Sequence, residues 1–316
     1  MSSSDSCCEA LTGLFHAAVR RTRERSSLNA APSGSLEPEP KTPAVLLNLH
    51  PGVSIHALRT GDSVGDAADV FSGVGDSTGH CPWWGGVLLA AWMAEAPADL
   101  FTGRRVMELG CGSAALPSVV ASVRGAAAVC ATDRSPGNLR AARSVLARNG
   151  APAESCSARR LAWEDGVAQT DALSWDVVLF ADVLYVKGMA ATLAKTVAAL
   201  LRPGGTVLGA VAVHRTESVE IFKEMQRHGL SVQEVELPDV VQSSAAEAAE
   251  RLREANRCNP FGSMGLSGDR NGCKLLRWTR QGQEAGADMA EALEQEVLHA
   301  PPVCEEQACQ GWQPTE

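Results

Sequence analysis

Two hydrophobic patterns alternate along the central part of this chain. Short apolar runs that end in polar residues are followed by longer stretches in which apolar residues recur every three or four positions. The runs are typical of buried β-strands and the stretches of helices, so their alternation predicts an α/β fold with helices on both faces of a mainly parallel sheet. The predicted strands are residues 105–109, 126–132, 157–161, 175–181, 206–213, 230–237 and 274–279, with one or two more in residues 44–58. The predicted helices are residues 88–100, 115–123, 136–148, 190–201 and 216–228, with one more at 244–257.

These elements indicate one domain with two extensions. We place the domain at residues 44–280, after a flexible N-terminal extension at 1–43 and before an acidic tail at 281–316 that we expect to be disordered. Residues 238–271 form a long insertion near the sheet edge, which we expect to be either functional or an exposed, solvated helix.

The negative charge of the chain is concentrated in the tail. The formal net charge is -9, and the tail contains eight acids and no Lys or Arg, which leaves about -1 on residues 1–280. A nearly neutral domain without a large basic surface argues against a nucleic-acid partner.

The most informative segment is residues 104–112, where an apolar run ends in an acid and two glycines separated by Cys111. In a parallel sheet the carboxyl end of the first strand points at the ligand. Gly110 and Gly112 are expected to let the backbone turn tightly and approach that ligand. The segment from Gly110 to Ala115 also satisfies the loose dinucleotide-binding pattern, so the turn by itself leaves the cofactor open.

Two acids narrow the choice of ligand. Asp133 lies 21 residues after Gly112, at the end of the second predicted strand, where an acid accepts the hydroxyl groups of an adenosine ribose. Glu108 lies beside the glycine turn. The negatively charged pyrophosphate of a dinucleotide is not stabilised by an acid at this position. S-adenosylmethionine instead carries an amino group and a sulfonium. The two acids therefore favour a positively charged ligand.

A second informative segment follows the predicted strand 175–181. Asp182 and Tyr185, the only tyrosine of the chain, come at its carboxyl end, where ligands of α/β proteins bind. The alternatives are that Asp182 caps the following helix and that Tyr185 is a packing residue.

Several motifs in this order resemble methyltransferase family 16, a family of seven-strand enzymes that mostly methylate lysine in proteins. The motifs are Glu-Leu-Gly-Cys-Gly at 108–112, Thr-Asp at 132–133, Leu-Ala-Trp at 161–163 and Ala-Asp-Val-Leu-Tyr at 181–185, preceded by a tryptophan before an apolar helix at 82–92. The resemblance covers about residues 78–237. Ala114 departs from it, because family members usually have a third glycine there, and so does the pair Gly85 and Gly86.

The resemblance implies a Rossmann-like, seven-strand class I methyltransferase sheet, S-adenosylmethionine as cofactor and a lysine-containing protein as substrate. It places Asp182 and Tyr185 at the substrate side of the site, where they would orient the lysine amine. It implies the following cofactor-binding residues: Trp83 with Trp84 as its alternative, Glu108, Gly110, Cys111, Gly112, Asp133, Trp163 beside the adenine, and Ala181.

Other functions remain open at this point. A small-molecule or RNA methyltransferase would share the cofactor cradle, although RNA enzymes of this fold more often carry Asn/Asp-Pro-Pro-Tyr/Phe where this chain has residues 182–185. A nicotinamide dehydrogenase shares the glycine turn but does not account for Glu108 or Tyr185. A cofactor-binding scaffold without activity is the alternative that Ala114 favours.

The remaining residues mainly exclude functions. Ten cysteines without Cys-x-x-Cys spacing indicate reduced thiols in the cytoplasm or the nucleus. The histidines have no metal-ligand spacing with them, so we expect no metal site. No uncharged apolar run reaches about 18 residues, so we expect no membrane span. We further expect a monomer. His214 and Arg215 follow the predicted strand 206–213, and we expect them to be a surface pair, with a substrate contact as the alternative.

Overall fold

The computed structural model describes residues 44–58, 78–168, 171–256, 264–266 and 272–280. The predicted N-terminal extension and acidic tail lie outside these residues.

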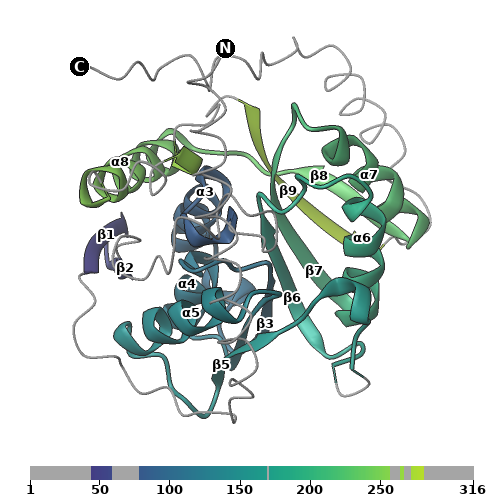
Figure 1. Ribbon diagram of the computed structural model, residues 1–316, viewed down its shortest axis with the longest axis horizontal. Coiled ribbons are helices and arrows are strands. Elements are labelled where there is room, and N and C mark those ends of the chain that lie inside the picture. Colours follow the sequence, from purple (N-terminus) through teal and green to yellow (C-terminus); the bar gives the residue numbers. More distant parts are fainter. Residues whose placement is uncertain (1–43, 59–77, 169–170, 257–263, 267–271, 281–316) are drawn as a thin grey trace, which may run out of the picture.

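The centre of the fold is a seven-stranded sheet with the strand order β5-β4-β3-β6-β7-β9-β8 (Figure 1). Neighbouring strands from β5 to β7 are parallel, and β9 is antiparallel to both of its neighbours. The chain crosses in opposite directions from β3 and from β6, so the strand order reverses between these two strands. The seven-strand α/β prediction is therefore confirmed. The strands are β3 (Arg105–Leu109), β4 (Ala128–Asp133), β5 (Cys156–Arg160), β6 (Trp175–Ala181), β7 (Leu201–Ala212), β8 (Leu230–Glu234) and β9 (Cys273–Arg280).

Helices cover both faces because successive strand residues point to opposite sides of the sheet. In β6, Val177 and Leu179 belong to the apolar core under α3, α4 and α5, whereas Val178 and Phe180 belong to the core under α6 and α7. Both faces of the central strands are thus buried, which explains their uninterrupted apolar runs. The helices are α3 (Trp84–Glu95), α4 (Leu116–Val123), α5 (Pro136–Arg148), α6 (Met189–Leu200) and α7 (Thr216–Arg227).

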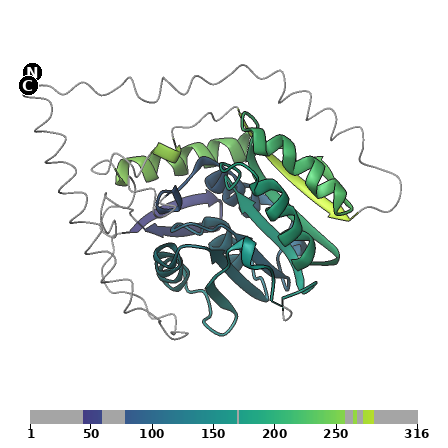
Figure 2. The same cartoon turned by 45° about the vertical axis from the view of Figure 1, so that its right-hand side comes forward.

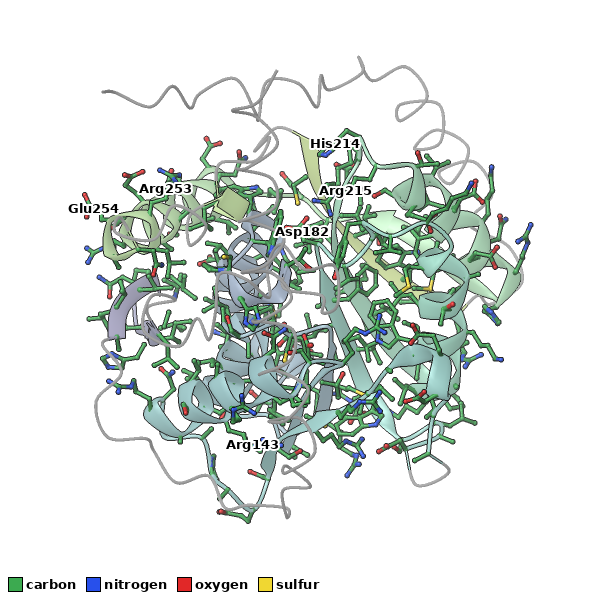
Figure 3. The ribbon with its side chains drawn as sticks, viewed as in Figure 1. Arg143, Asp182, His214, Arg215, Arg253 and Glu254 are labelled. Carbon is green, nitrogen blue, oxygen red and sulfur yellow. The ribbon has the colours of Figure 1, made fainter. Side chains whose placement is uncertain are left out.

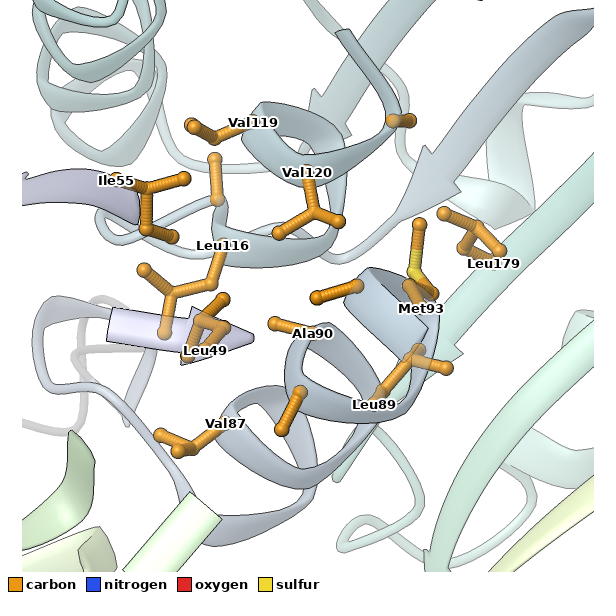
Figure 4. Close-up of a cluster of buried hydrophobic side chains, with 14 of the residues drawn as sticks. Leu49, Ile55, Val87, Leu89, Ala90, Met93, Leu116, Val119, Val120 and Leu179 are labelled. Atoms are coloured by element: carbon orange, nitrogen blue, oxygen red, sulfur yellow. The ribbon is translucent and has the colours of Figure 1, made fainter. Parts of the chain in front are cut away.

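The helix α3 lies in the middle of the apolar core that α3, α4 and α5 form on one face of the sheet. Its side chains Val87, Ala90 and Met93 are fully buried, and Figure 4 shows them among residues of α4, of β6 and of an N-terminal hairpin. The hydrophobic pattern of α3 accordingly runs all round the helix, as expected for an element covered on every side.

The hairpin and the insertion helix pack together on α3. The strands β1 (Ala44–His50) and β2 (Val53–Leu58) form a separate antiparallel sheet, and α8 (Asp239–Ala255) contacts both β1 and α3 (Figures 1 and 2). Of the two alternatives for the insertion, a helix exposed to solvent on all sides is therefore wrong. The helix α8 starts earlier than predicted and buries a stripe of apolar residues at helical spacing, which are Val241, Ala245, Ala248, Ala249 and Leu252.

Two boundaries differ from the predictions for local reasons. The predicted helix 88–100 is instead α3, which ends at Glu95, followed by a short 3-10 turn at Ala98–Leu100. Pro97 disfavours a helical conformation for Ala96 and has no N–H to continue the helix. The strand β7 begins at Leu201 rather than at 206, with a register irregularity opposite β6 between Trp175 and Val177.

The packing between β7 and its neighbours predicts that Gly209 does not tolerate a side chain. A Cβ atom on Gly209 would lie 2.6 Å from Cε2 of Phe180 and 2.8 Å from Cζ3 of Trp278. We expect Gly209→Ala to lower the free energy of unfolding by about 1–3 kcal/mol, the usual range for an overpacked core. The control is Gly86→Ala in α3, where a Cβ meets no atom within 4 Å. This variant should raise the free energy of unfolding by roughly 0.5–1 kcal/mol, because alanine is a better helix former than glycine. Urea unfolding of both variants tests this, and an unchanged midpoint for Gly209→Ala would contradict tight packing of the two rings.

Candidate active site

An open cavity lies at the carboxyl ends of β3, β4 and β6, where the strand order reverses. Its empty volume is about 980 Å³, including the open solvent at its mouth. This is the place where ligands of open α/β sheets bind. Of the predicted site residues, the cavity is lined by Trp83, Glu108, Gly110, Cys111, Gly112, Asp133, Trp163, Ala181, Asp182 and Tyr185.

The glycine turn needs its glycines for backbone reasons. Gly110 and Gly112 have φ angles of 70° and 59°, which glycine adopts without strain. A Cβ on Gly110 would lie 2.7 Å from Cγ1 of Val183, and one on Gly112 would lie 2.9 Å from the carbonyl oxygen of Gly79. A side chain at either position is therefore also excluded by contacts with other parts of the chain, namely Val183 and Gly79.

The segment before α3 is fastened onto this turn. Gly79, in the 3-10 turn Thr78–His80, accepts a hydrogen bond from the Ser113 N–H at 2.7 Å, and the Ser113 hydroxyl donates to the His80 carbonyl at 2.9 Å. Thr78 and Gly79 also line the cavity. The sequence analysis missed these residues, because the contacts join segments about 33 residues apart and leave no local pattern.

Glu108 lies in the cavity wall, with its carboxyl group turned toward α4. It is 3% exposed, and Oε2 accepts hydrogen bonds from the N–H and the hydroxyl of Ser118, in the first turn of that helix. Burial raises the pKa of Glu108 to about 7, because desolvation outweighs the stabilising bonds from Ser118. Near neutral pH the protonated and ionised forms of Glu108 are thus comparably populated.

Asp133 connects the turn after β3 with the turn after β4. Its Oδ2 accepts a hydrogen bond from the Gly112 N–H at 2.9 Å, and its Oδ1 accepts from the Ser135 N–H at 2.8 Å and from Nδ2 of Asn138 at 3.2 Å. The bonds hold this carboxylate at the cavity wall, at the position where the sequence predicts a ribose contact.

Asn138 is a cavity residue that the sequence analysis did not identify. It is 2% exposed, and its Oδ1 has no hydrogen-bond partner within the described part of the chain. A buried acceptor without a donor is costly unless a ligand supplies one. Together with Asp133 and the half-buried Trp163, it fits a ligand that combines hydroxyl donors with an aromatic ring, as adenosine does.

The two tryptophans before α3 have different environments. Trp83 lines the cavity and donates from Nε1 to the Thr78 carbonyl at 2.7 Å. Trp84 is 7% exposed, packs in the core under α3 and does not line the cavity. The alternative assignment of Trp84 to the cofactor is therefore wrong, because the first turn of α3 directs its side chain into the core.

Asp182 caps a helix, but a different one from the helix expected. Its backbone is left-handed, with φ 54°, and its Oδ2 accepts a hydrogen bond of 2.6 Å from the N–H of Gly85, in the first turn of α3. The following helix, α6, is instead preceded by Gly188. The carboxylate thus connects the end of β6 with the start of α3.

Tyr185 is 43% exposed at the mouth of the cavity. Its hydroxyl accepts a hydrogen bond from the Thr78 hydroxyl at 2.9 Å. The ring is therefore held at a boundary between cavity and solvent, which argues against a purely packing role.

Arg215 is a second site residue that the sequence analysis misjudged. His214 is exposed as expected, but the Arg215 side chain is 22% exposed and turns toward Asp182, with Nη1 3.9 Å from Oδ1 (Figure 3). The guanidinium also lies over the Trp83 ring, 5.8 Å from its centroid. Burial raises the pKa of Asp182, and the charge of Arg215 opposes that rise.

Within the described residues, no group of three or more His, Cys, Asp or Glu is placed to hold a metal ion. None of the helices in the described ranges is long and apolar enough to cross a membrane.

The raised pKa of Glu108 predicts a pH-dependent stability. Between the ordinary carboxyl pKa of 4.5 and about 7, the folded protein binds more protons at this site than the unfolded chain, so the contribution of Glu108 becomes less favourable as the pH rises. We expect Glu108→Gln to remove this loss, which is at most about 3 kcal/mol. Urea unfolding at pH 5 and pH 7.5 measures it. A wild type and a variant whose stabilities change equally between the two pH values would exclude the raised pKa.

Comparisons with known proteins identify the family. A family model described as lysine methyltransferase matches residues 66–228, just over half of the chain. No curated protein matches the sequence. Among solved structures, an S-adenosylmethionine-dependent methyltransferase from Mesorhizobium loti is 20% identical, with 60% of this chain and 98% of that chain covered and a TM-score of 0.40. A ribosomal protein L11 methylase from Lactobacillus delbrueckii subsp. bulgaricus is 15% identical, with 61% and 77% covered and a TM-score of 0.40.

The assignment follows from the sequence match together with the observed strand order. The matched residues include β3 to β7 and all the residues that line the cavity. The chain belongs to the lysine methyltransferase family and is an S-adenosylmethionine-dependent methyltransferase.

Proposed function

We propose that this chain is a protein-lysine N-methyltransferase, which methylates the side-chain amine of a lysine in a protein substrate. The observation that carries the proposal is that Asp182 and Tyr185 line the same cavity as the glycine turn and Asp133. One continuous cavity thus joins the residues assigned to the cofactor with the residues assigned to the substrate.

The residues that would hold S-adenosylmethionine are those of the predicted cradle together with Asn138. We assign the ribose to Asp133 and Asn138, the adenine to Trp163, and the methionine part to the turn from Gly110 to Gly112. When bound, the cofactor supplies a methyl group already activated by a sulfonium, so the protein contributes mainly orientation and exclusion of water.

On the substrate side, the lysine must arrive as the uncharged amine, because only a lone pair attacks a methyl group. A partly apolar wall lowers the pKa of an ammonium by desolvation, and its proton leaves through the open mouth of the cavity to solvent. We assign the contact with the amine to the ring and hydroxyl of Tyr185, which reach both cavity and solvent. Asp182, whose carboxylate binds Gly85 and faces Arg215, then acts by positioning this wall.

The substrate class is tested with radiolabelled S-adenosylmethionine, the purified full-length chain and cell extract. We expect label in a fraction that protease removes and ribonuclease leaves, and methyl-lysine after acid hydrolysis. Label that ribonuclease removes, or label in the small-molecule filtrate, would replace lysine by RNA or by a metabolite. No label in an extract when calorimetry shows cofactor binding would favour the inactive scaffold.

Tyr185→Phe tests the substrate end. The ring remains but the hydroxyl that Thr78 binds is lost, so we expect kcat to fall by about tenfold or more, equivalent to about 1.4 kcal/mol of transition-state stabilisation. Calorimetry should give a cofactor Kd within about twofold of the wild type. A large change of Kd with unchanged kcat would move Tyr185 to the cofactor end.

Asp133→Asn tests the cofactor end. The variant keeps the shape of the side chain but removes the charge and one of the oxygens that accept N–H groups, so we expect the S-adenosylmethionine Kd to rise by about tenfold or more. The matched control is Asp165→Asn, in an exposed ion pair with Arg160 outside the cavity lining, which should leave the Kd unchanged. Equal affinities of both variants would show that the ribose is bound elsewhere.

A further inference from the structure

The substrate end of the cavity is built from a closed series of contacts. The Tyr185 hydroxyl binds the Thr78 hydroxyl, the Thr78 carbonyl binds Nε1 of Trp83, and the Trp83 ring lies under the Arg215 guanidinium. Arg215 faces Asp182, which precedes Tyr185 by three residues. The series joins the loop before α3, the end of β6 and the end of β7, so Arg215 is the member that connects the third element to the other two.

Arg215 makes two contacts with Asp182 rather than one. Its Nη1 lies 3.9 Å from the carboxylate Oδ1 and donates to the Asp182 carbonyl oxygen at 3.4 Å. The carbonyl contact fixes the backbone of a residue in the left-handed region, where non-glycine residues are uncommon. The carboxylate contact compensates a side chain that is only 7% exposed.

Few other groups can compensate this charge. Within the described ranges, the other groups that face Asp182 are the Gly85 N–H from α3, His214 beside Arg215, and the buried thiol of Cys273 at the start of β9. Cys273 carries no positive charge, and His214 is exposed to solvent. Removing one partner of a buried ion pair leaves an uncompensated charge, which is strongly unfavourable.

The carboxylate of Asp182 lies directly against the first turn of α3, where it accepts the Gly85 N–H. A Cβ on Gly85 would lie 2.6 Å from Oδ2 of Asp182. Trp83 is similarly confined, because a Cβ on Gly265 would lie 2.7 Å from its Cδ2. The planar guanidinium of arginine both stacks on a ring and pairs with a carboxylate, which the ammonium of lysine does not do equally well.

We propose that Arg215 is a positioning residue for methyl transfer, which pairs with the Asp182 carboxylate and holds Trp83 in place and thereby fixes the wall against which Tyr185 orients the substrate. Its role as part of the reaction rests on the proposed protein-lysine activity. The contact between Arg215 and Asp182 does not depend on that activity, and the thermal midpoint measures it independently.

Three variants separate charge, stacking and shape. Arg215→Met removes the charge and keeps an apolar stem of similar length. Arg215→Lys keeps the charge and loses the planar stack. Gly265→Ala displaces Trp83 and leaves the ion pair intact. The pH dependence of kcat/KM for methylation and the thermal midpoint between pH 5 and pH 8 are measured for each in the full-length chain.

For Arg215→Met we expect kcat/KM to fall by tenfold or more. Without the nearby cation the pKa of Asp182 rises further, so the acid limb of the pH profile should move to higher pH. Because the folded pKa of this acid is then still farther above its unfolded value, the thermal midpoint should fall more steeply from pH 5 to pH 8 than in the wild type. Asp182→Asn in the Arg215→Met background should abolish that steeper fall.

Arg215→Lys and Gly265→Ala should both lower kcat/KM several-fold with the acid limb unmoved. A rate loss in Arg215→Met without any shift of the acid limb, and with a thermal midpoint that depends on pH as in the wild type, would overturn the proposal and leave Arg215 a structural residue. If no variant and not even the wild type methylates lysine, the proposed function fails. A steeper fall of the thermal midpoint with pH in Arg215→Met would then still support the ion pair.

Discussion

At three of the described helices that begin without a side-chain cap of their own, buried carboxylates from elsewhere in the chain take its place. The N-cap residues of α3, α4 and α6 make no side-chain bond to the helix. N–H groups at the starts of these helices donate instead to Asp182, Glu108 and Glu217. Unpaired N–H groups at a buried helix start are costly, and a carboxylate there is stabilised by the helix dipole as well. Each acid therefore fixes one helix start against a particular element of the fold.

The cavity owes its shape to these same bonds. Asp182 and Glu108 belong to its wall, and Asp133 ties the two turns beside it through bonds to Gly112 and Ser135. The carboxyl groups are oriented by backbone donors before any ligand binds, so little reorganisation is needed when one does. Their burial also raises the pKa of Glu108 and of Asp182. Glu108 and Asp182 therefore act first on the helix starts that form the cavity wall.

The sequence predicted those parts of the structure that depend on local pattern. The strand 175–181 and the helix 136–148 have the predicted bounds, because an uninterrupted apolar run and a proline start with a nearby glycine stop are local signals. The start of α3 was missed by four residues, since Gly85 and Gly86 are poor helix formers and the acid that caps them lies about 97 residues away. The inward position of Arg215 was missed for the same reason. Its partners come from β6 and from the loop before α3, and no spacing along the chain connects them.

The Asp-x-x-Tyr signature after β6 combines two residues that do different physical work. Asp182 is buried and engaged with Gly85, whereas Tyr185 is 43% exposed at the cavity mouth. Two residues of an irregular turn, Val183 and Leu184, separate them, and the left-handed conformation of Asp182 turns the chain so that the acid faces inward and the ring outward. An amide in place of the acid would weaken the pairing with Arg215, and an alanine would in addition leave the Gly85 N–H without its acceptor. The acid is thus required by the architecture of the site, while the ring, which lies half exposed at the mouth of the cavity, is the part of the signature open to a substrate.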